Sequence, residues 1–442
     1  MSFSKLRTCH ITFFALSAML IACGSSGDDD NGGSDATEDG PGEVLQSSLE
    51  RDLSPEVDEG AKDTLSADNR EFAFNLLDRI VDEGDDNVFF SPHSISIALA
   101  MTYAGASGGT HEEMAEVLRF TLDEDELHPA FNFLDLALDE RSEADVESGD
   151  PPRLEVVNAT WGQKDFPFHE DYLDTLALHY GAGLRAVDFA NEYEEVRQQI
   201  NEWVEDQTED RIKNLLPEGS IEPSTVLVLT NAIYFLAGWQ NEFSEGRTSD
   251  EPFTRSDGTQ VQAPLMTQEE NFPHYLGDDT HAISLRYVGG DISFVALKPA
   301  DADGLSEWED NFDRDHFDEV IAGLQPGMGT VSLPKFRFEG DYDLKQLFEL
   351  MGWENFFELA RMVESETGGL EITDILHKSF IDLDEEGTEA AAATAVVVGE
   401  ASAPVGDDFD LSFDRPFYYA IYDHPTDTIL FLGRMADPTV EE

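Results

Sequence analysis

A short glycine-rich motif carries the residue pattern of a catalytic nucleophile. Gly105-Ala106-Ser107-Gly108-Gly109 matches the Gly-x-Ser-x-Gly elbow of hydrolases, whose serine attacks a carbonyl carbon. The elbow needs a strand before the serine and a helix directly after it. Residues 95–104 are a long apolar run with alanine and methionine, which indicates a helix. Ser107 is therefore expected in a helix–helix turn, and a serine hydrolase using Ser107 is kept only as an alternative.

Patterns of metal ligands were also sought. Residues 382–387, Asp-Leu-Asp-Glu-Glu-Gly, open like a calcium-binding EF-hand loop. The twelfth position of that loop should be a bidentate glutamate, but here it is Ala393. The histidines lack metal-binding spacing, and both cysteines, Cys9 and Cys23, precede the predicted domain. We therefore expect no metal site and no cofactor.

The charge balance is strongly acidic. There are 94 Asp and Glu residues against 26 Lys and Arg residues, which gives a formal net charge of −68. Nucleic-acid binding requires a basic surface, so we exclude that class of partner. The acidic residues are spread along the chain, which favours a solvated surface suited to a saline medium over a cation-binding site.

The first residues predict an export signal, residues 1–23. Lys5 and Arg7 precede an apolar run, residues 11–22, that is too short to span a bilayer comfortably. Residues 20–24, Leu-Ile-Ala-Cys-Gly, resemble a bacterial lipobox. This resemblance implies cleavage before Cys23 and lipid attachment to its thiol, and the alternative is an ordinary secretory signal. We expect an exported protein, either a membrane-anchored lipoprotein or an extracellular or cell-surface one.

A tether and a single large domain are predicted after the signal. Residues 24–65 are rich in Gly, Ser, Asp and Glu, with almost no aromatic or β-branched residues. Such a segment buries too little apolar surface to offset its ordering entropy, which predicts a disordered acidic tether. Residues 66–442 are the predicted folded domain.

The rest of the domain is organised around residues 377–416. Residues 380–384 follow a period of two, as a strand does: Phe380, Asp382 and Asp384 alternate with Ile381 and Leu383, and Glu385-Glu386-Gly387 ends that strand. The small residues that follow place one uncharged set on one face at a period of two: Thr388, Ala390, Ala392, Thr394, Val396 and Val398. A segment of this kind can enter a sheet without burying a charge, which would be very costly.

Helices and strands are mixed along the domain. Residues 72–80 have helical spacing, and Thr110 with Glu113 is a candidate capping box. Residues 225–235 form a near-continuous apolar run, typical of a strand buried on both faces. Residues 154–161 predict a further strand, and residues 415–421 and 429–434 predict a hairpin of buried strands. The pattern indicates an α+β fold.

Taken in order, these segments resemble the serpins, which are serine protease inhibitors. The resemblance rests on Asn87 to Ser94, Asn158 to Trp161, residues 225–235, the alanine-rich hinge and the C-terminal hairpin, and it covers roughly residues 68–438. It implies three β-sheets with about nine α-helices and an exposed reactive-centre loop that inserts into a sheet. It also implies a hydrogen-bonded cluster where the central sheet opens, formed by Ser91, Ser94, Asn231, His377 and Trp239.

The resemblance further implies a mechanism. A serine peptidase would cut the loop, form a covalent acyl-enzyme and be trapped when the loop inserts. The implied hinge is made of Glu385, Glu386, Gly387, Thr388, Glu389, Ala390, Ala391, Ala392 and Ala393. Its small residues match the inhibitory pattern. A non-inhibitory substrate or binding protein of the same fold is the alternative, and in either case we expect a monomer and no enzyme.

Counting the family's usual span from Glu385 places the reactive bond between Ala401 and Ser402. The bonds Glu400–Ala401 and Ser402–Ala403 stay open. A small residue before the cut suits an elastase-like or subtilisin-like peptidase. A trypsin-like pocket requires Lys or Arg, and residues 396–404 contain neither.

Overall fold

The computed structural model describes residues 40–82, 87–144, 146, 149–302, 304–363, 371–388 and 409–440. The helices of this part are α1 (Glu59–Asp82), α2 (Pro92–Tyr103), α3 (Gly108–Leu118), α4 (Glu124–Ser142), α5 (Glu170–Tyr180), α6 (Phe189–Gln207), α7 (Leu305–Glu309), α8 (Arg314–Gly323) and α9 (Leu344–Met351), with one 3-10 turn, η1 (Glu245–Arg247). The strands are β1 (Glu43–Leu45), β2 (Val88–Phe90), β3 (Arg153–Gln163), β4 (Leu184–Val187), β5 (Leu227–Gly238), β6 (Ser249–Thr254), β7 (Gln260–Leu276), β8 (Thr280–Arg286), β9 (Ile292–Pro299), β10 (Gln325–Pro334), β11 (Phe336–Asp343), β12 (Ile375–Leu383), β13 (Gly387–Thr388), β14 (Phe409–Ser412), β15 (Phe417–Asp423) and β16 (Thr428–Met435).

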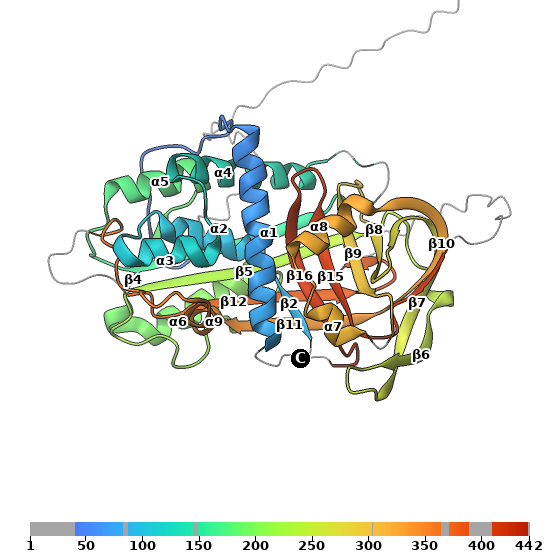
Figure 1. The fold of residues 1–442 in the computed structure, drawn as a ribbon. Coiled ribbons are helices and arrows are strands. Elements are labelled where there is room, and N and C mark those ends of the chain that lie inside the picture. Colours follow the sequence, from blue (N-terminus) through green and yellow to red (C-terminus); the bar gives the residue numbers. More distant parts are fainter. Residues whose placement is uncertain are drawn as a thin grey trace, which may run out of the picture. The chain divides into compact units, whose positions relative to one another are not determined.

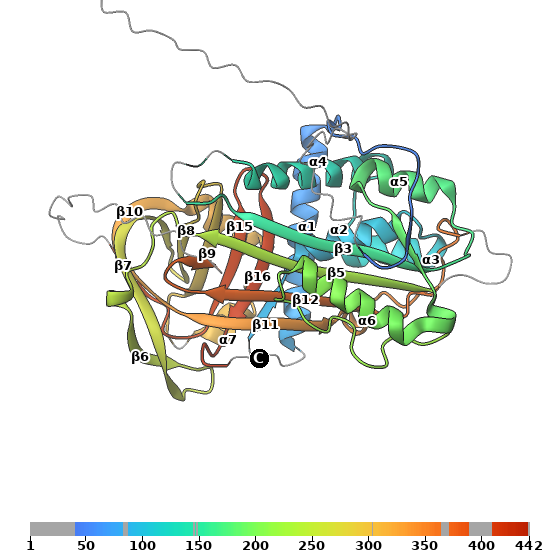
Figure 2. The ribbon, with the colours of Figure 1, turned by 180° about the vertical axis from the view of Figure 1, so that it is seen from behind.

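A seven-stranded sheet with the order β1-β4-β3-β5-β13-β12-β11 carries the hinge. Its long strands β3, β5, β12 and β11 lie side by side in Figure 2. One face packs on α6 through a cluster that includes Trp161, Trp203 and Tyr234, and the other face packs on α2. Because both faces are covered, β5 is an apolar run rather than an alternating one. The predicted buried strand is thereby confirmed.

The second sheet has nine strands, ordered β14-β10-β7-β8-β9-β15-β16-β2, with β6 paired to β7. Three sheets were expected, but two of them share one strand here. β7 pairs with β6 through residues 260–265, with β10 through residues 265–274 and with β8 through residues 274–276. Its length lets a single strand carry the hydrogen-bond ladder from one sheet into the next. The predicted hairpin is present as β15 and β16, which pair antiparallel.

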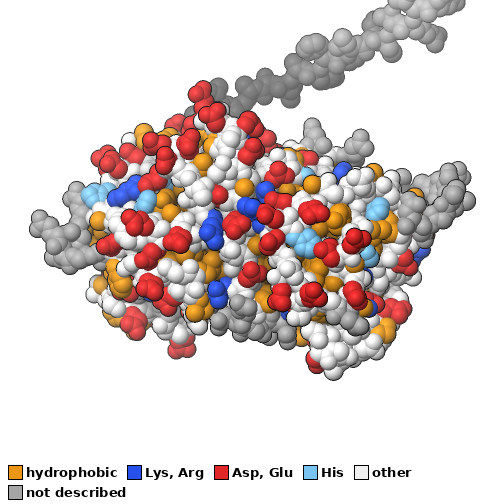
Figure 3. Space-filling view, in the orientation of Figure 1, with side chains coloured by type: hydrophobic (Ala, Val, Ile, Leu, Met, Phe, Trp, Pro, Cys, Tyr) orange, Lys and Arg blue, Asp and Glu red, His pale blue; other side chains and the backbone are white. Residues whose placement is uncertain are grey.

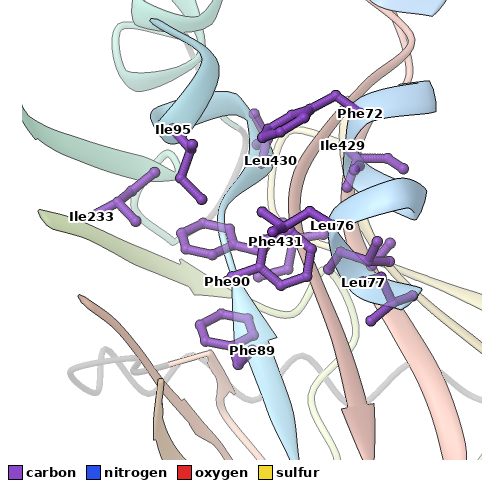
Figure 4. Packing of buried hydrophobic residues seen from close by; sticks show 14 of the residues in the cluster. Phe72, Leu76, Leu77, Phe89, Phe90, Ile95, Ile233, Ile429, Leu430 and Phe431 are labelled. Atoms are coloured by element: carbon purple, nitrogen blue, oxygen red, sulfur yellow. The ribbon is translucent and has the colours of Figure 1, made fainter. Parts of the chain in front are cut away.

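The main core lies where α1, β2 and β16 meet (Figure 4). Phe89 on β2 stacks on Phe431 of β16, with ring centroids 4.9 Å apart, and Phe72, Leu76 and Leu77 of α1 close over them. Each fully buried side chain of this size contributes about 1.5–3 kcal/mol of hydrophobic stabilisation. Residues far apart in the chain are thus fixed together beneath the seven-stranded sheet.

Part of the segment predicted as a tether belongs to the folded domain. β1 pairs antiparallel with β4, and the amide of Asp52 donates to Leu178 O at 2.9 Å. Arg51 adds an ion pair to Asp135 at 2.6 Å. The predicted boundary at residue 65 is therefore wrong, and α1 starts at Glu59. Composition missed this because β1 gains its stability from an existing sheet edge rather than from its own apolar content.

The predicted capping box at Thr110 is also wrong. α3 begins at Gly108 with Ser107 in the cap position, so Thr110 lies inside the helix. Its hydroxyl donates to Asn355 O at 2.7 Å, and Glu113 accepts from the amides of Glu354 and Asn355 at 2.7 Å each. These side chains stabilise a distant segment instead of their own helix, since that segment offers unpaired backbone groups close by.

α1 crosses the front of the domain between the helices α2 to α5 and the second sheet (Figure 1). Acidic side chains are scattered over this face rather than gathered in one area (Figure 3), in keeping with a solvated acidic surface. None of the helices in the described residues has both the length and the apolar character that a bilayer-spanning helix requires.

Candidate functional site

The hinge is a tight turn between β12 and β13. β12 ends at Leu383, and the amide of Asp384 donates to Gly387 O at 2.9 Å. The Asp384 side chain accepts from the amides of Glu386 and Gly387 at 2.8 and 3.2 Å. Aspartate suits this position because its short carboxylate reaches backbone donors two and three residues ahead. The predicted strand break at residues 385–387 is confirmed.

After the turn, the chain lies between two strands of the sheet. Gly387 pairs with Gly238 of β5, and Thr388 pairs with Ala237 of β5 and Leu383 of β12. A Cβ at Gly387 would overlap Ala237 O, so the close approach requires glycine there. Thr388 is buried, and its hydroxyl lies 2.6 Å from the hydroxyl of Tyr287. The first two residues after the turn are therefore seated inside the sheet.

Trp239 and Phe243, which follow β5 in the chain, hold the turn from the side. The indole Nε1–H of Trp239 donates to Asp384 O, and its amide donates to Glu386 O, both at 2.9 Å. The amide of Phe243 donates to Glu385 O at 2.9 Å. Three successive hinge carbonyls are thus bonded by Trp239 and Phe243, which we call the hinge clasp. Trp239 was expected in the cluster with His377, but the structure places it at the hinge instead.

Glu385 anchors the same turn through its side chain. Its carboxylate forms an ion pair with Lys335 and accepts from Thr248 Oγ1 at 2.6 Å. Burial raises the pKa of Glu385, but the bonds from Lys335 and Thr248 outweigh burial, so its pKa lies below the ordinary value. Glu385 is therefore charged at neutral pH. Neighbouring Glu386 has its pKa raised, by desolvation and by nearby carboxylates such as Asp384.

A gap in pairing lies directly below the seated hinge residues. β5 and β12 pair in parallel only from Leu229↔Ile375 to Ile233↔Ser379. β13 takes over the pairing at the hinge, with Ala237 of β5 and Leu383 of β12, so within the described residues no ladder pair joins β5 directly to β12 beyond Ile233↔Ser379. Both strands keep their partners on the outer sides, β3 and β11. β5 and β12 are thus paired directly at one end of the sheet and are not paired directly at the hinge end within the described residues.

A buried hydrogen-bonded network ties β5 to β12 where they are closed. The amide of Ser91 donates to His377 Nε2 at 3.1 Å, and His377 Nδ1 contacts Asn231 Oδ1. Asn231 Nδ2 donates to Ser94 O at 2.8 Å and also contacts Asn158. His377 and Asn231 are themselves register partners of the two strands. The structure thus brings together four of the five residues grouped from the sequence, Ser91, Ser94, Asn231 and His377.

These contacts define the state of the histidine. Nε2 accepts from a backbone N–H, so the proton of the neutral ring is on Nδ1, facing Asn231. Burial lowers the pKa of His377 to about 3. The ring is neutral at physiological pH and buried away from solvent. It cannot exchange protons with a substrate, so its geometry fits a hydrogen bond that holds β12 to β5 and does not fit acid–base catalysis.

The remaining predicted residues fall into two groups. Ser107 lies in the turn between α2 and α3, where its hydroxyl donates to Glu358 O at 3.0 Å and accepts from the amide of Ala360 at 3.3 Å. A helix precedes it instead of the strand that a nucleophile elbow requires. Outside the described residues lie the lipidation site Cys23, hinge residues 389–393 and the reactive-bond residues Glu400, Ala401, Ser402 and Ala403.

Sequence reasoning missed Lys335, Thr248, Phe243 and Tyr287, which surround the hinge. Lys335 gave the one usable signal, because it is a basic residue directly after the strand-ending Pro334 in a strongly acidic chain. The other three are ordinary residues in their local sequence. Only the fold shows that they meet Glu385 and Thr388.

Comparison with known proteins gives a consistent result. A family model described as Serpin (serine protease inhibitor) matches residues 67–438. An uncharacterised serpin-like protein of Thermococcus kodakarensis is 38% identical over 370 residues, which covers 83% of this chain and 84% of that protein. The leukocyte elastase inhibitor of Equus caballus is 36% identical over 388 residues, covering 85% and 99%. The solved structure of uncleaved ovalbumin has a TM-score of 0.75 at 25% identity and covers 85% of this chain and 100% of its own.

Proposed function

The chain belongs to the serpin family, and we propose that it inhibits serine peptidases as a suicide substrate. The peptidase serine Oγ would attack the carbonyl carbon of Ala401. The C–N bond to Ser402 breaks, an ester to the enzyme forms, and the proton of the serine passes to the released amine. Insertion of the cut loop would then trap the ester before water hydrolyses it.

The observation that carries this proposal is the register of the seated hinge. β13 runs antiparallel to β5 with Thr388 opposite Ala237. Continued in that register, residues 389–391 would meet residues 236–234 of β5 and 382–380 of β12, at levels where no ladder pair joins the two strands directly in the described residues. The strand would gain ladder partners on both sides. The first step of insertion would therefore separate none of the five direct ladder pairs between β5 and β12.

Further insertion has to separate β5 from β12. Residues 392–396 would then replace the five register pairs from Ile233↔Ser379 to Leu229↔Ile375. In this register Thr394 falls at the level of His377 and Asn231, so their hydrogen bond has to break. The sheet-opening network would thus resist insertion until the loop is cut. Thr394 is uncharged, so its entry leaves no unpaired charge in the core.

The test is incubation of the protein with pancreatic elastase, subtilisin and trypsin, followed by denaturing gels and mass analysis. We expect a band at the summed mass that survives boiling in SDS with elastase or subtilisin, and a released fragment that begins near Ser402. Trypsin should give no such band, because residues 396–404 offer it no Lys or Arg.

A pair of adjacent variants adds a matched control. Ala390 falls on the same face as buried Thr388, whereas Ala391 falls on the opposite face. Ala390→Arg should abolish the covalent band while cleavage continues, and Ala391→Arg should keep more of it. Cleavage of the unmodified protein without a covalent band would establish the alternative, a substrate-type or binding member of the family. No cleavage by any of the three peptidases would refute the assignment of the loop tip.

We also propose export, with a lipid on Cys23 that anchors a monomeric domain to a membrane. The 18 residues from Cys23 to Gly40, joined by 17 peptide bonds, span at most about 60 Å when fully extended. Labelling with a radioactive fatty acid should mark the unmodified protein and not Cys23→Ser. Equal labelling of both would exclude this anchor.

A further inference from the structure

A pocket of about 300 Å³ lies beside the hinge clasp, among the end of β5, β7, β8 and Pro326 of β10. The carboxyl end of β5 approaches β7 and β8 in both views of the fold (Figures 1 and 2). Trp239, Phe243 and Phe272 form buried apolar parts of its wall. The volume matches the low end of ligand-binding cavities, about 300 Å³.

The polar groups of the lining favour one sign of charge. Arg286 is exposed and is the one charged residue among the described lining residues, in a chain with 94 acidic residues. No ion pair joins Arg286 to a carboxylate in the described part of the chain. An arginine without a carboxylate partner, in an otherwise acidic protein, favours an anionic ligand.

A second polar group supports the same reading. Ser284 stands two residues before Arg286 on β8, so the two side chains point to the same face of the strand. The hydroxyl of Ser284 is buried and has no hydrogen-bond partner among the described residues. A buried hydroxyl without a partner is unfavourable, and a ligand oxygen would satisfy it.

We propose that this pocket binds a small organic carboxylate with an aromatic or aliphatic body. Arg286 and Ser284 would hold the carboxylate, and Trp239, Phe243 and Phe272 would contact the apolar body. The site differs from the reactive loop and from the sheet-opening network, and binding to it can be measured without a peptidase. A failure to bind the carboxylate would therefore leave the proposed inhibition of peptidases unaffected, and a failure to inhibit would leave this site unaffected.

The pocket also has a direct route to the hinge. Two wall residues, Trp239 and Phe243, donate all three clasp hydrogen bonds to the carbonyls of Asp384, Glu385 and Glu386. The Trp239 ring also stacks on Tyr287 with centroids 4.7 Å apart, and Tyr287 meets Thr388. A ligand packed against Trp239 and Phe243 therefore braces the residues that hold the hinge. Its binding should slow hydrogen exchange at the amides of both residues.

The test compares naphthylacetate with its neutral counterpart naphthylacetamide, by calorimetric titration of the purified protein. Naphthylacetate should bind about fivefold more tightly, the upper range for one partly exposed charge pair. Arg286→Gln should remove that difference. Arg247→Gln, which makes the same charge change on η1 outside the lining, should preserve it.

A pocket-filling variant tests whether the two probes bind inside this pocket and not elsewhere on the protein. Asn271 is an exposed lining residue on β7, and Asn271→Trp should block both probes without changing the circular dichroism spectrum. Equal binding of the two probes, or an unchanged preference in Arg286→Gln, would overturn the proposed carboxylate site. Binding with no change in exchange at residues 239 and 243 would refute the connection to the hinge.

Discussion

The ion pair between Glu385 and Lys335 should be a measurable part of the force that holds the hinge. The Glu385 side chain is 9% exposed and that of Lys335 is 35% exposed. Fully exposed pairs contribute about 0.2–1 kcal/mol, whereas removing one partner of a fully buried pair costs about 3–5 kcal/mol. This pair lies between those limits, so we expect Glu385→Gln to lower the free energy of unfolding by about 1–2 kcal/mol.

The assay is urea unfolding, monitored by tryptophan fluorescence. It compares the unmodified protein, Glu385→Gln, Lys335→Met and the double variant. The double-mutant cycle isolates the coupling between the two side chains. Glu386→Gln is the matched control, because the pKa of Glu386 is raised and the removal of its charge relieves repulsion. It should not lower stability.

The pH dependence gives an independent check. The pKa of Glu385 is lowered by folding, so its contribution is present above the unfolded value and is lost as pH falls through the folded value. The stability difference between the unmodified protein and Glu385→Gln should therefore shrink on acidification. A coupling energy below about 0.3 kcal/mol, which is within the error of additivity, or a difference that grows on acidification, would refute this reasoning.

Three further predictions concern the sheet and its edge. Burial keeps His377 neutral in the native state, whereas in the unfolded chain the ring takes up a proton near its ordinary pKa of about 6.5. The stability of the protein should therefore fall as pH falls from about 6.5 towards the folded pKa of about 3. His377→Leu should flatten this part of the plot of urea midpoint against pH, and an unchanged plot would count against this prediction. Gly387→Ala should displace the hinge from the sheet and speed hydrogen exchange there, because its Cβ would overlap Ala237 O. Gly238→Ala, whose Cβ would lie 3.6 Å from the nearest atom, should have little effect; equal effects would exclude the steric cause. Arg51→Ala should lower the free energy of unfolding by about 1 kcal/mol, seen as a lower urea midpoint, since Arg51 bonds Asn132 and Asp135. Leu53→Ala, at a side chain that is 72% exposed, should not lower it. Equal midpoints for the Arg51 and Leu53 variants would mean that the segment before α1 adds nothing to stability.

The sequence by itself determined the elements whose signal is local. The apolar run of β5 indicated a strand covered on both faces, and residues 385–387 indicated where β12 ends. The small residues after Gly387 indicated a segment able to enter a sheet, of which Thr388 is seated in the sheet and the others lie outside the described residues. Each of these follows from side-chain type and spacing within a few residues, which is the information that periodicity and backbone preference contain.

Only the tertiary structure decided which residues meet at the hinge. Lys335 lies 50 residues before Glu385, and Trp239 lies 145 residues before Asp384. The order of the strands and their register create these contacts, and no local pattern specifies them. The edge strand β1 follows the same rule, because its hydrogen bonds come from β4. Long-range pairing therefore set the clasp, the ion pair and the place of β1 in the sheet.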